Sequence, residues 1–131
     1  MSVIPESHAD LLDALTVANV ATVGPKGEPQ VNPVWFEWDG ETINLSQNHT
    51  KQKYKNIKAN PQVAVSILDP ENPYRYLEVR GVVSEIADDP DYAFINRQAK
   101  RYTQQDTYGG LKAGEKRVIV KITPERTSAM G

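Results

Sequence analysis

The segment His49-Thr-Lys-Gln-Lys-Tyr-Lys-Asn-Ile-Lys-Ala-Asn-Pro61 holds four lysines and no acidic residue. Removing these four positive charges from the net charge of −2 leaves −6 on the rest of the chain. The segment lies between the strand-like runs 41–48 and 62–68, and Thr50 as a candidate N-cap predicts a helix near 50–59. Free N–H groups at a positive helix end, beside lysines, favour a phosphate site, although a charge run more often marks a solvated helix.

The composition is that of one globular domain spanning residues 1–131. Hydrophobic residues make up 39% and charged residues 24%, which is unlike a disordered chain. No apolar run approaches the roughly 20 residues of a membrane span, and the N-terminus lacks the basic start and apolar core of a signal peptide. We therefore expect a cytoplasmic protein. The absence of cysteine excludes disulfides, thiolate nucleophiles and zinc–thiolate sites.

Before the lysine segment, the pattern predicts one helix and three strands. Ser7 is a candidate N-cap, and leucines at helical spacing follow it. Gly24 to Gly27 and Asp39-Gly40 are turn signals. The expected elements are a helix near 8–17, a buried strand over 18–23, a strand over 29–38, and a strand over 41–48 antiparallel to it.

After the lysine segment, the pattern predicts three more strands and one helix. Two prolines and an asparagine break the chain at 69–73. Gly81 permits a bulge, and the acidic cluster Asp88 to Asp91 with Pro90 is typical of a helix start. The expected elements are strands over 62–68, 76–86 and 116–123, a helix near 89–103 and a loop over 104–115. Six strands joined mostly by hairpins imply a small antiparallel barrel, closed or partly closed, of the all-β to α+β class.

The sequence contains few of the residue patterns that catalytic side chains form. His8 and His49 are the only histidines, and they form neither an H-E-x-x-H pair nor a metal-ligand cluster. A G-x-S-x-G elbow, a Walker loop and a G-x-G-x-x-G fingerprint are also missing. We predict no catalytic side chain and no metal. An enzyme with this inventory needs a cofactor for the chemical step.

Several motifs occur in a characteristic order: 29–38, the Asp39-Gly40 turn, the alternating run 42–47, the lysine segment and Asn60-Pro61. This order resembles the pyridoxamine-phosphate-oxidase-like split β-barrel family of flavin and deazaflavin proteins. Lys-x-Lys-x-x-Asn-Ile before Asn-Pro-x-Val resembles the short oxidoreductases of that family that use coenzyme F420. Each motif is a common strand–turn pattern, so the weight lies in their order and spacing. The resemblance implies a six-stranded antiparallel split barrel with a few short helices.

The resemblance also implies a homodimer with a tricyclic cofactor ring near the subunit interface. Adjacent strand positions face opposite ways, so at least one of Trp35 and Phe36 is left for a ring or a partner. The positions that match cofactor-binding positions of the family are Lys51 and Lys53 for the phosphate, Gln52 and Asn56 for the tail, Asn32, Pro33, Val34 and Trp35 for the ring, Ser46 and Gln47 at the neighbouring strand end, and Tyr74 and Tyr76 from the partner subunit.

The function implied is hydride transfer between F420 and a small or conjugated organic acceptor, such as a quinone, an enone or lactone, or a tetrapyrrole. FMN is the alternative cofactor, since one lysine can serve either phosphate; four lysines suit the longer anionic tail of F420 better. A non-enzymatic carrier of flavin, deazaflavin or haem is a second alternative. A nucleic-acid binder is a third, and the acidic remainder of the chain argues against it.

Overall fold

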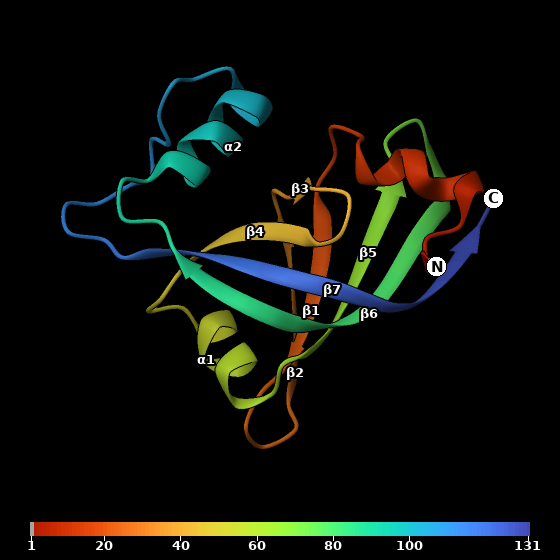
Figure 1. Ribbon diagram of the computed structural model, residues 1–131, viewed down its shortest axis with the longest axis horizontal. Coiled ribbons are helices and arrows are strands. Elements are labelled where there is room, and N and C mark those ends of the chain that lie inside the picture. Colours follow the sequence, from red (N-terminus) through yellow and green to blue (C-terminus); the bar gives the residue numbers. More distant parts are fainter. Residues whose placement is uncertain (1) are drawn as a thin grey trace.

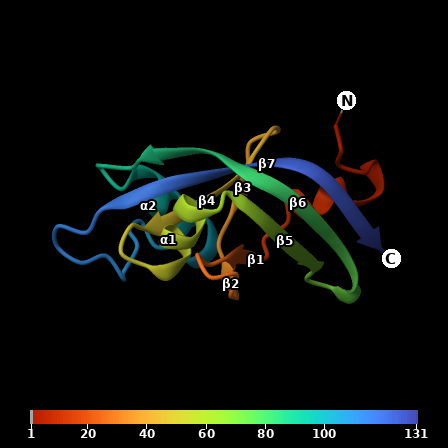
Figure 2. The ribbon, with the colours of Figure 1, turned by 90° about the horizontal axis from the view of Figure 1, so that it is seen from below.

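The computed structural model describes residues 2–131 and contains one antiparallel sheet of seven strands, in the order β2-β1-β5-β6-β7-β4-β3. The sheet is curled into a half-barrel (Figures 1 and 2). This confirms the antiparallel split-barrel α+β fold with short helices. The elements in chain order are η1 (Glu6–Leu12), β1 (Ala18–Val23), β2 (Pro29–Val34), β3 (Glu37–Trp38), β4 (Ile43–Asn48), α1 (Gln52–Ala59), β5 (Gln62–Asp69), β6 (Asn72–Asp88), α2 (Ala93–Thr103) and β7 (Arg117–Met130).

The core lies on the concave side of the sheet. Alternate residues of the strands point there because successive side chains of a strand face opposite ways. Leu11 and Leu12 of η1 close one end of this core. The fully buried strand residues include Val20, Ile43, Leu45, Val65, Ile67, Leu77, Val79, Val118, Val120 and Ile122. The period-2 pattern of the sequence therefore sets which face of the sheet is buried.

The sheet has seven strands rather than six because the predicted strand 29–38 is broken. β2 pairs with β1, whereas β3 pairs with β4, so the two pieces lie at opposite edges of the sheet. The predicted hairpin between 29–38 and 41–48 survives only in the short β3–β4 pairing. The break occurs at Phe36, whose N–H donates to the Tyr102 hydroxyl (3.2 Å) and whose carbonyl accepts from Arg101 (2.6 Å). Partners from α2 thus replace the strand ladder at this point.

The predicted break at 69–73 is a tight turn, and the strands around it are longer than predicted. Asp69 pairs with Asn72, and its carboxylate accepts a hydrogen bond from the Glu71 N–H (2.8 Å). β7 also continues to Met130, far beyond 123, because it pairs with β6 from Tyr76 to Asp88. The prediction of a bulge at Gly81 is confirmed: the β6–β7 register shifts there, and a Cβ would lie 2.3 Å from the Thr123 carbonyl oxygen.

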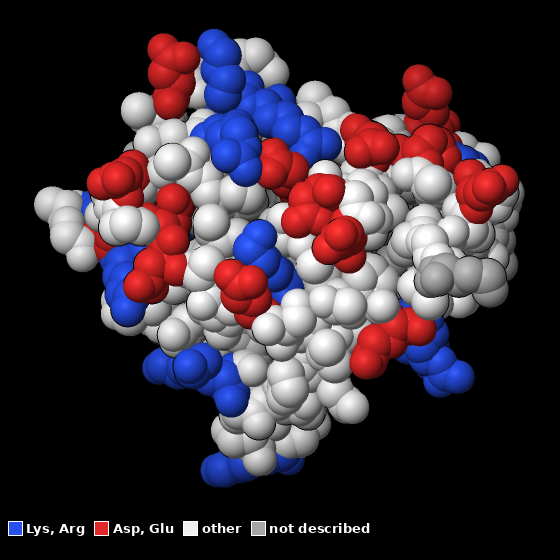
Figure 3. Space-filling model, in the orientation of Figure 1, with Lys and Arg blue, Asp and Glu red and all other residues white. Residues whose placement is uncertain are grey.

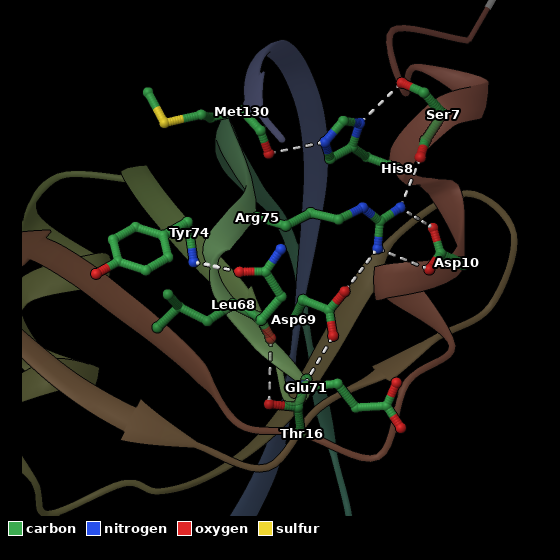
Figure 4. A network of polar contacts seen from close by, with 11 residues as sticks. Ser7, His8, Asp10, Thr16, Leu68, Asp69, Glu71, Tyr74, Arg75 and Met130 are labelled. Atoms are coloured by element: carbon green, nitrogen blue, oxygen red, sulfur yellow. Dashed lines mark hydrogen bonds and ion pairs between the residues drawn. The ribbon is translucent and has the colours of Figure 1, made fainter.

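The first helix differs from its prediction in type and length. It is a 3₁₀ helix that begins after Pro5 and ends at Leu12, so it does not reach residue 17, and Ser7 does not cap it. Arg75 holds it against the start of β6 (Figure 4): its guanidinium donates to the Asp10 carboxylate (2.7 Å) and the Asp69 carboxylate (3.0 Å). These contacts fix η1 at the end of the sheet away from α1 and α2 (Figure 1).

The helix predicted near 89–103 has the predicted carboxylate at its N-terminal end, but it begins later than predicted. The Asp89 carboxylate accepts hydrogen bonds from the N–H groups of Phe94 (3.1 Å) and Ile95 (3.2 Å). Helix α2 begins only at Ala93, because Tyr92 adopts a left-handed conformation with φ of 60°. The segment 104–116 after α2 is irregular, as predicted. Among residues 2–131, none of the helices has the length and apolar character to cross a membrane.

Candidate functional site

Two adjoining cavities lie at the split of the half-barrel, below α2. The first has a volume of about 380 Å³ and the second about 400 Å³. Tyr108 and Arg117 line both, so the two cavities form one groove. The first cavity is lined by Val17, Pro33, Val34, Trp35, Ser46, Ile95, Gln98, Tyr108 and Arg117. The second is lined by residues 48–51 and by Tyr108, Gly110 and residues 112–117.

Aromatic side chains form one wall of the first cavity. Phe36 is fully buried, whereas Trp35 faces the cavity, as strand alternation predicted. The Trp35 ring stacks on Tyr102, with centroids 5.3 Å apart and planes 9° apart. Tyr108 meets the Trp35 ring edge-on at 5.8 Å. This cluster holds the Trp35 ring in one orientation and gives the cavity a flat apolar side.

Arg117 places a positive charge where the two cavities meet. Its guanidinium pairs with the Glu115 carboxylate (2.5 Å) and lies 5.0 Å from the centre of the Tyr108 ring. It also approaches the Ser46 hydroxyl (3.5 Å). Arg117 and Ser46 lie on the face of the β7–β4 pair opposite the buried Val118. Arg117 thus joins the segment 104–116 to the sheet.

The second cavity opens beside the start of α1. Lys51 is the N-cap of α1 and lines this cavity, and its side chain makes no cap hydrogen bond. The prediction that Thr50 is the N-cap is wrong, because its hydroxyl donates to the Asn48 side-chain oxygen (2.8 Å) instead. The first turn of α1 holds no acidic residue. In Figure 3 the charged side chains at the lower end of the molecule, around α1 and the β1–β2 turn, are basic.

Lys53 is the one buried lysine or arginine among residues 2–131. Its side chain lies on the inner face of α1, and the residue is only 8% exposed. Within the described chain, no carboxylate forms an ion pair with it. Burial lowers the pKa of the Lys53 ammonium to about 8, from an ordinary value of 10.5. A buried cation that lacks a counter-charge in its own chain is a candidate for binding an anion.

Asn56 docks α1 on the sheet. Its side-chain amide donates to the Thr22 hydroxyl (3.0 Å) and to the Gln30 side-chain oxygen (3.2 Å). Its own oxygen accepts a hydrogen bond from the Gln52 amide (2.8 Å). Both amide hydrogens of Asn56 are therefore used inside the protein. This arrangement fixes the face of α1 that carries Lys53, while Gln52 stays exposed at the helix start.

The remaining predicted site residues lie away from the cavity walls described above. Asn32 lies opposite Val20 in the β1–β2 pairing. Gln47 is buried on the core side of β4, opposite to Ser46. Tyr74 and Tyr76 lie at the start of β6, near η1 and far along the sheet from the groove (Figure 1). Within one chain, the structure therefore brings Pro33, Val34, Trp35 and Ser46 together in the first cavity and Lys51 beside the second.

Comparison with known proteins supplies the family. The sequence model of pyridoxamine 5'-phosphate oxidase matches residues 4–131. The chain belongs to the pyridoxamine 5'-phosphate oxidase family. The similarity spans the whole split barrel and both cavities, and it confirms the family that the order of the sequence motifs indicated.

Solved structures of the pyridoxamine 5'-phosphate oxidase fold include similar chains with different names. An F420 reductase is 45% identical, with a TM-score of 0.86, over 95% of this chain and 98% of that chain. A conserved hypothetical protein from Mycobacterium tuberculosis is 26% identical (TM-score 0.73; 98% and 85%). HutZ, the heme storage protein from Vibrio cholerae, is 19% identical (TM-score 0.69; 100% and 96%) and shows the common fold alone. A comparison with curated proteins gave no match.

The sequence missed several residues of the groove. Ile95, Gln98, Tyr108 and Arg117 line the first cavity, and none was predicted. For Arg117 a signal exists, because the alternation of Val118, Val120 and Ile122 places it on the face opposite the core. Gln98 and Tyr108 carry no comparable signal, since their positions depend on how α2 and the segment 104–116 fold over the sheet.

Proposed function

We propose that this protein is an oxidoreductase that binds coenzyme F420 in the groove. The ring occupies the first cavity, and the phosphate-bearing tail lies in the second cavity beside α1. The observation that carries this proposal is the continuity of the groove, from an aromatic cavity at Trp35 to a basic one at Lys51. A planar ring would suit the aromatic cavity, and an anionic tail attached to it would suit the basic one. The 45% identity to an F420 reductase supports F420 ahead of FMN.

The residues present fit such a group. Trp35 lines the first cavity and is held in place by its stacking on Tyr102, so it offers an apolar surface to a ring. Arg117 lines both cavities and lies where the ring would continue into its tail. Lys51 lines the second cavity and would provide positive charge for a phosphate. Lys53 lies two residues further along α1 and lines neither cavity, so it would act on the phosphate from the buried side of the helix. The acidic Glu115 in the second cavity is paired with Arg117, which reduces its repulsion of an anion.

The bound coenzyme would supply the hydride chemistry, and the protein would orient the reactants. None of the residues that line the first cavity is a carboxylate or a histidine. The contribution of the chain is therefore to fix the ring, to hold an acceptor against its open side and to exclude water. We propose a small or conjugated organic acceptor, such as a quinone, an enone or lactone, or a tetrapyrrole.

FMN is the second candidate cofactor, because it shares the ring and phosphate and the family is that of pyridoxamine 5'-phosphate oxidase. Titration of the purified protein with F420 and with FMN distinguishes the two. We expect a colourless protein that binds added F420 more tightly than FMN. A yellow protein that retains FMN through purification would reverse this assignment.

The proposed phosphate site can be tested on α1. Lys53 is buried near the start of the helix, whereas Lys58 is exposed in its last turn. A charge-assisted hydrogen bond contributes about 1.5–3 kcal/mol, so Lys53→Ala should weaken F420 binding by about ten- to a hundredfold. Lys58→Ala should have the small effect of a screened surface charge. Fluorescence titration at fixed salt measures the F420 affinity of both variants. Equal losses of affinity would mean that the lysines act only as a diffuse basic patch, and the proposed phosphate site would be wrong.

We also propose a homodimer in which the outer face of the sheet is the interface. Val31, Ala21, Ala64 and Arg80 are cross-strand neighbours on this face. Val31 is 62% exposed and Tyr74 is 80% exposed. Exposed apolar side chains on a broad sheet face are typical of an interface. The dimer would allow Tyr74 of one subunit to approach the groove of the other.

A further inference from the structure

Gln98 lines the first cavity, and one polar atom of its side chain is buried without a hydrogen-bond partner. The residue lies on the buried face of α2 and is 1% exposed. Its side-chain nitrogen donates to the Glu37 carboxylate (3.2 Å). Its side-chain oxygen has no hydrogen-bond partner, and in the described part of the chain it is the one buried side-chain polar atom of which this is true. A buried acceptor without a partner is destabilising. Its position in a residue that lines a cavity suggests that a ligand supplies the missing donor.

The orientation of the Gln98 amide is fixed by its neighbours. Glu37 forms two hydrogen bonds with the Arg97 guanidinium, of 3.0 and 2.7 Å. These bonds with Arg97 lower the pKa of the Glu37 carboxyl, which keeps it ionised and able only to accept. The amide nitrogen of Gln98 must therefore face Glu37. Turning the amide over would place its oxygen against a carboxylate, so the oxygen is held on the other side.

The other polar groups of the first cavity differ from this oxygen. Arg117 and the Trp35 indole nitrogen can only donate hydrogen bonds, and the Ser46 hydroxyl lies near Arg117. Gln98 thus carries an unpaired acceptor, whereas the other side chains of the first cavity offer mainly donors and apolar groups. The ligand that suits it carries an N–H group at the edge of a flat ring. Flavin and deazaflavin rings have one such group, the imide N–H between two carbonyls.

We propose that the Gln98 side-chain oxygen accepts a hydrogen bond from the imide N–H of the ring bound in the first cavity. This inference rests on the proposed function, and it deepens it by naming the residue that sets the position of the ring. It holds for F420 and for FMN, because both rings carry the imide. The oxygen is buried in the ligand-free chain, so contact with the ring requires the Gln98 amide to turn towards the cavity. Glu37 would keep its two bonds to Arg97 during that change.

The test compares wild type with Gln98→Met, which keeps the approximate size of the side chain and removes both the acceptor and the amide donor to Glu37. Gln105→Met, in the exposed segment after α2, is the matched control. We expect Gln98→Met to weaken F420 binding about five- to tenfold, as for one neutral hydrogen bond, and the control to bind like wild type. The melting temperature of the ligand-free Gln98→Met protein should stay close to that of wild type, because the variant loses the bond to Glu37 and also removes an unpaired buried acceptor. Normal F420 binding by Gln98→Met, with a lowered melting temperature, would overturn the proposal.

A second arm identifies the donor on the ligand. The probes are a 5-deazaflavin ring compound and its N3-methyl derivative, which lacks the imide hydrogen. Wild type should prefer the N–H compound, and Gln98→Met should lose that preference. A preference retained in Gln98→Met would show that the methyl group acts by its size, and would overturn the proposal. If wild type binds neither probe nor F420, the proposed function itself fails. If wild type binds F420 and Gln98→Met binds it equally well, only the role of Gln98 fails.

Discussion

Replacement of Lys53 by methionine should make the free protein more stable and a poorer binder at once. Methionine keeps the length of the side chain and removes its charge. Burial lowers the pKa of Lys53 from 10.5 to about 8, and each pKa unit corresponds to about 1.4 kcal/mol. The buried ammonium therefore destabilises the folded protein at pH 7 by up to about 3 kcal/mol. Lys53→Met should recover part of that free energy of unfolding.

The sign of the pH dependence follows from the same shift. The folded chain holds the Lys53 proton less tightly than the unfolded chain does, so the penalty is fully present below pH 8. Between pH 8 and 10.5 the ammonium is lost from the folded protein, and the stability of wild type rises relative to that of the variant. The advantage of Lys53→Met should therefore shrink across this interval. F420 binding by wild type should weaken above pH 8 for the same reason.

Urea denaturation at pH 7 and at pH 10 measures the stability, and fluorescence titration with F420 measures the binding. Lys55→Met is the matched control, because Lys55 is exposed on the same helix and its removal should change stability by no more than about 0.5 kcal/mol. A clear loss of stability in Lys53→Met at pH 7 would mean that the ammonium is held by favourable contacts. The interpretation of Lys53 as an uncompensated cation would then be wrong.

Three further predictions concern the fold and the assembly. Gly81→Ala should lower the free energy of unfolding by about 1–3 kcal/mol, since its Cβ would press on the Thr123 carbonyl; urea denaturation checks this. Tyr102→Phe should lower it by about 1–2 kcal/mol, because the Phe36 N–H loses its acceptor; unchanged thermal unfolding would contradict that role. Val31→Lys should shift a dimer towards monomer in sedimentation, with the melting behaviour of the subunit retained; a wild-type monomer at micromolar concentration would remove the proposed interface.

Local pattern was enough to predict most of the sheet. A short apolar run located β1, alternating apolar residues located β4 and β5 closely, and Gly81 predicted the bulge. The errors came from partners that lie far away in sequence. Phe36 leaves the ladder because Arg101 and Tyr102 satisfy its backbone groups. β7 extends to Met130 because β6 is there to pair with it, and no local signal in 124–130 requires a strand.

The residues of the groove also divide into those that local sequence predicts and those that depend on distant partners. Trp35 and Ser46 could be placed from strand alternation and from family resemblance, since Ser46 lies within β4 and Trp35 directly follows β2. Gln98 and Tyr108 could not, because their neighbours are set by the packing of α2 and of an irregular segment against the sheet. Lys53 was predicted, with Lys51, as a phosphate-binding lysine, but its burial was not predicted and depends on how Asn56 docks α1. Burial, rather than charge, distinguishes it from the other lysines of the helix.

Two segments lie over the groove: helix α2, which is anchored to the sheet, and the irregular segment 104–116. Helix α2 is held at its start by Asp89 and near its end by the bonds of Arg101 and Tyr102 to Phe36. Moving α2 would disturb the junction between β2 and β3, so insertions and deletions there are expected to be poorly tolerated. The segment 104–116 contains no helix or strand and connects α2 to β7. Its length and composition can diverge while the barrel stays intact, so we expect relatives to differ in this segment more than in α2.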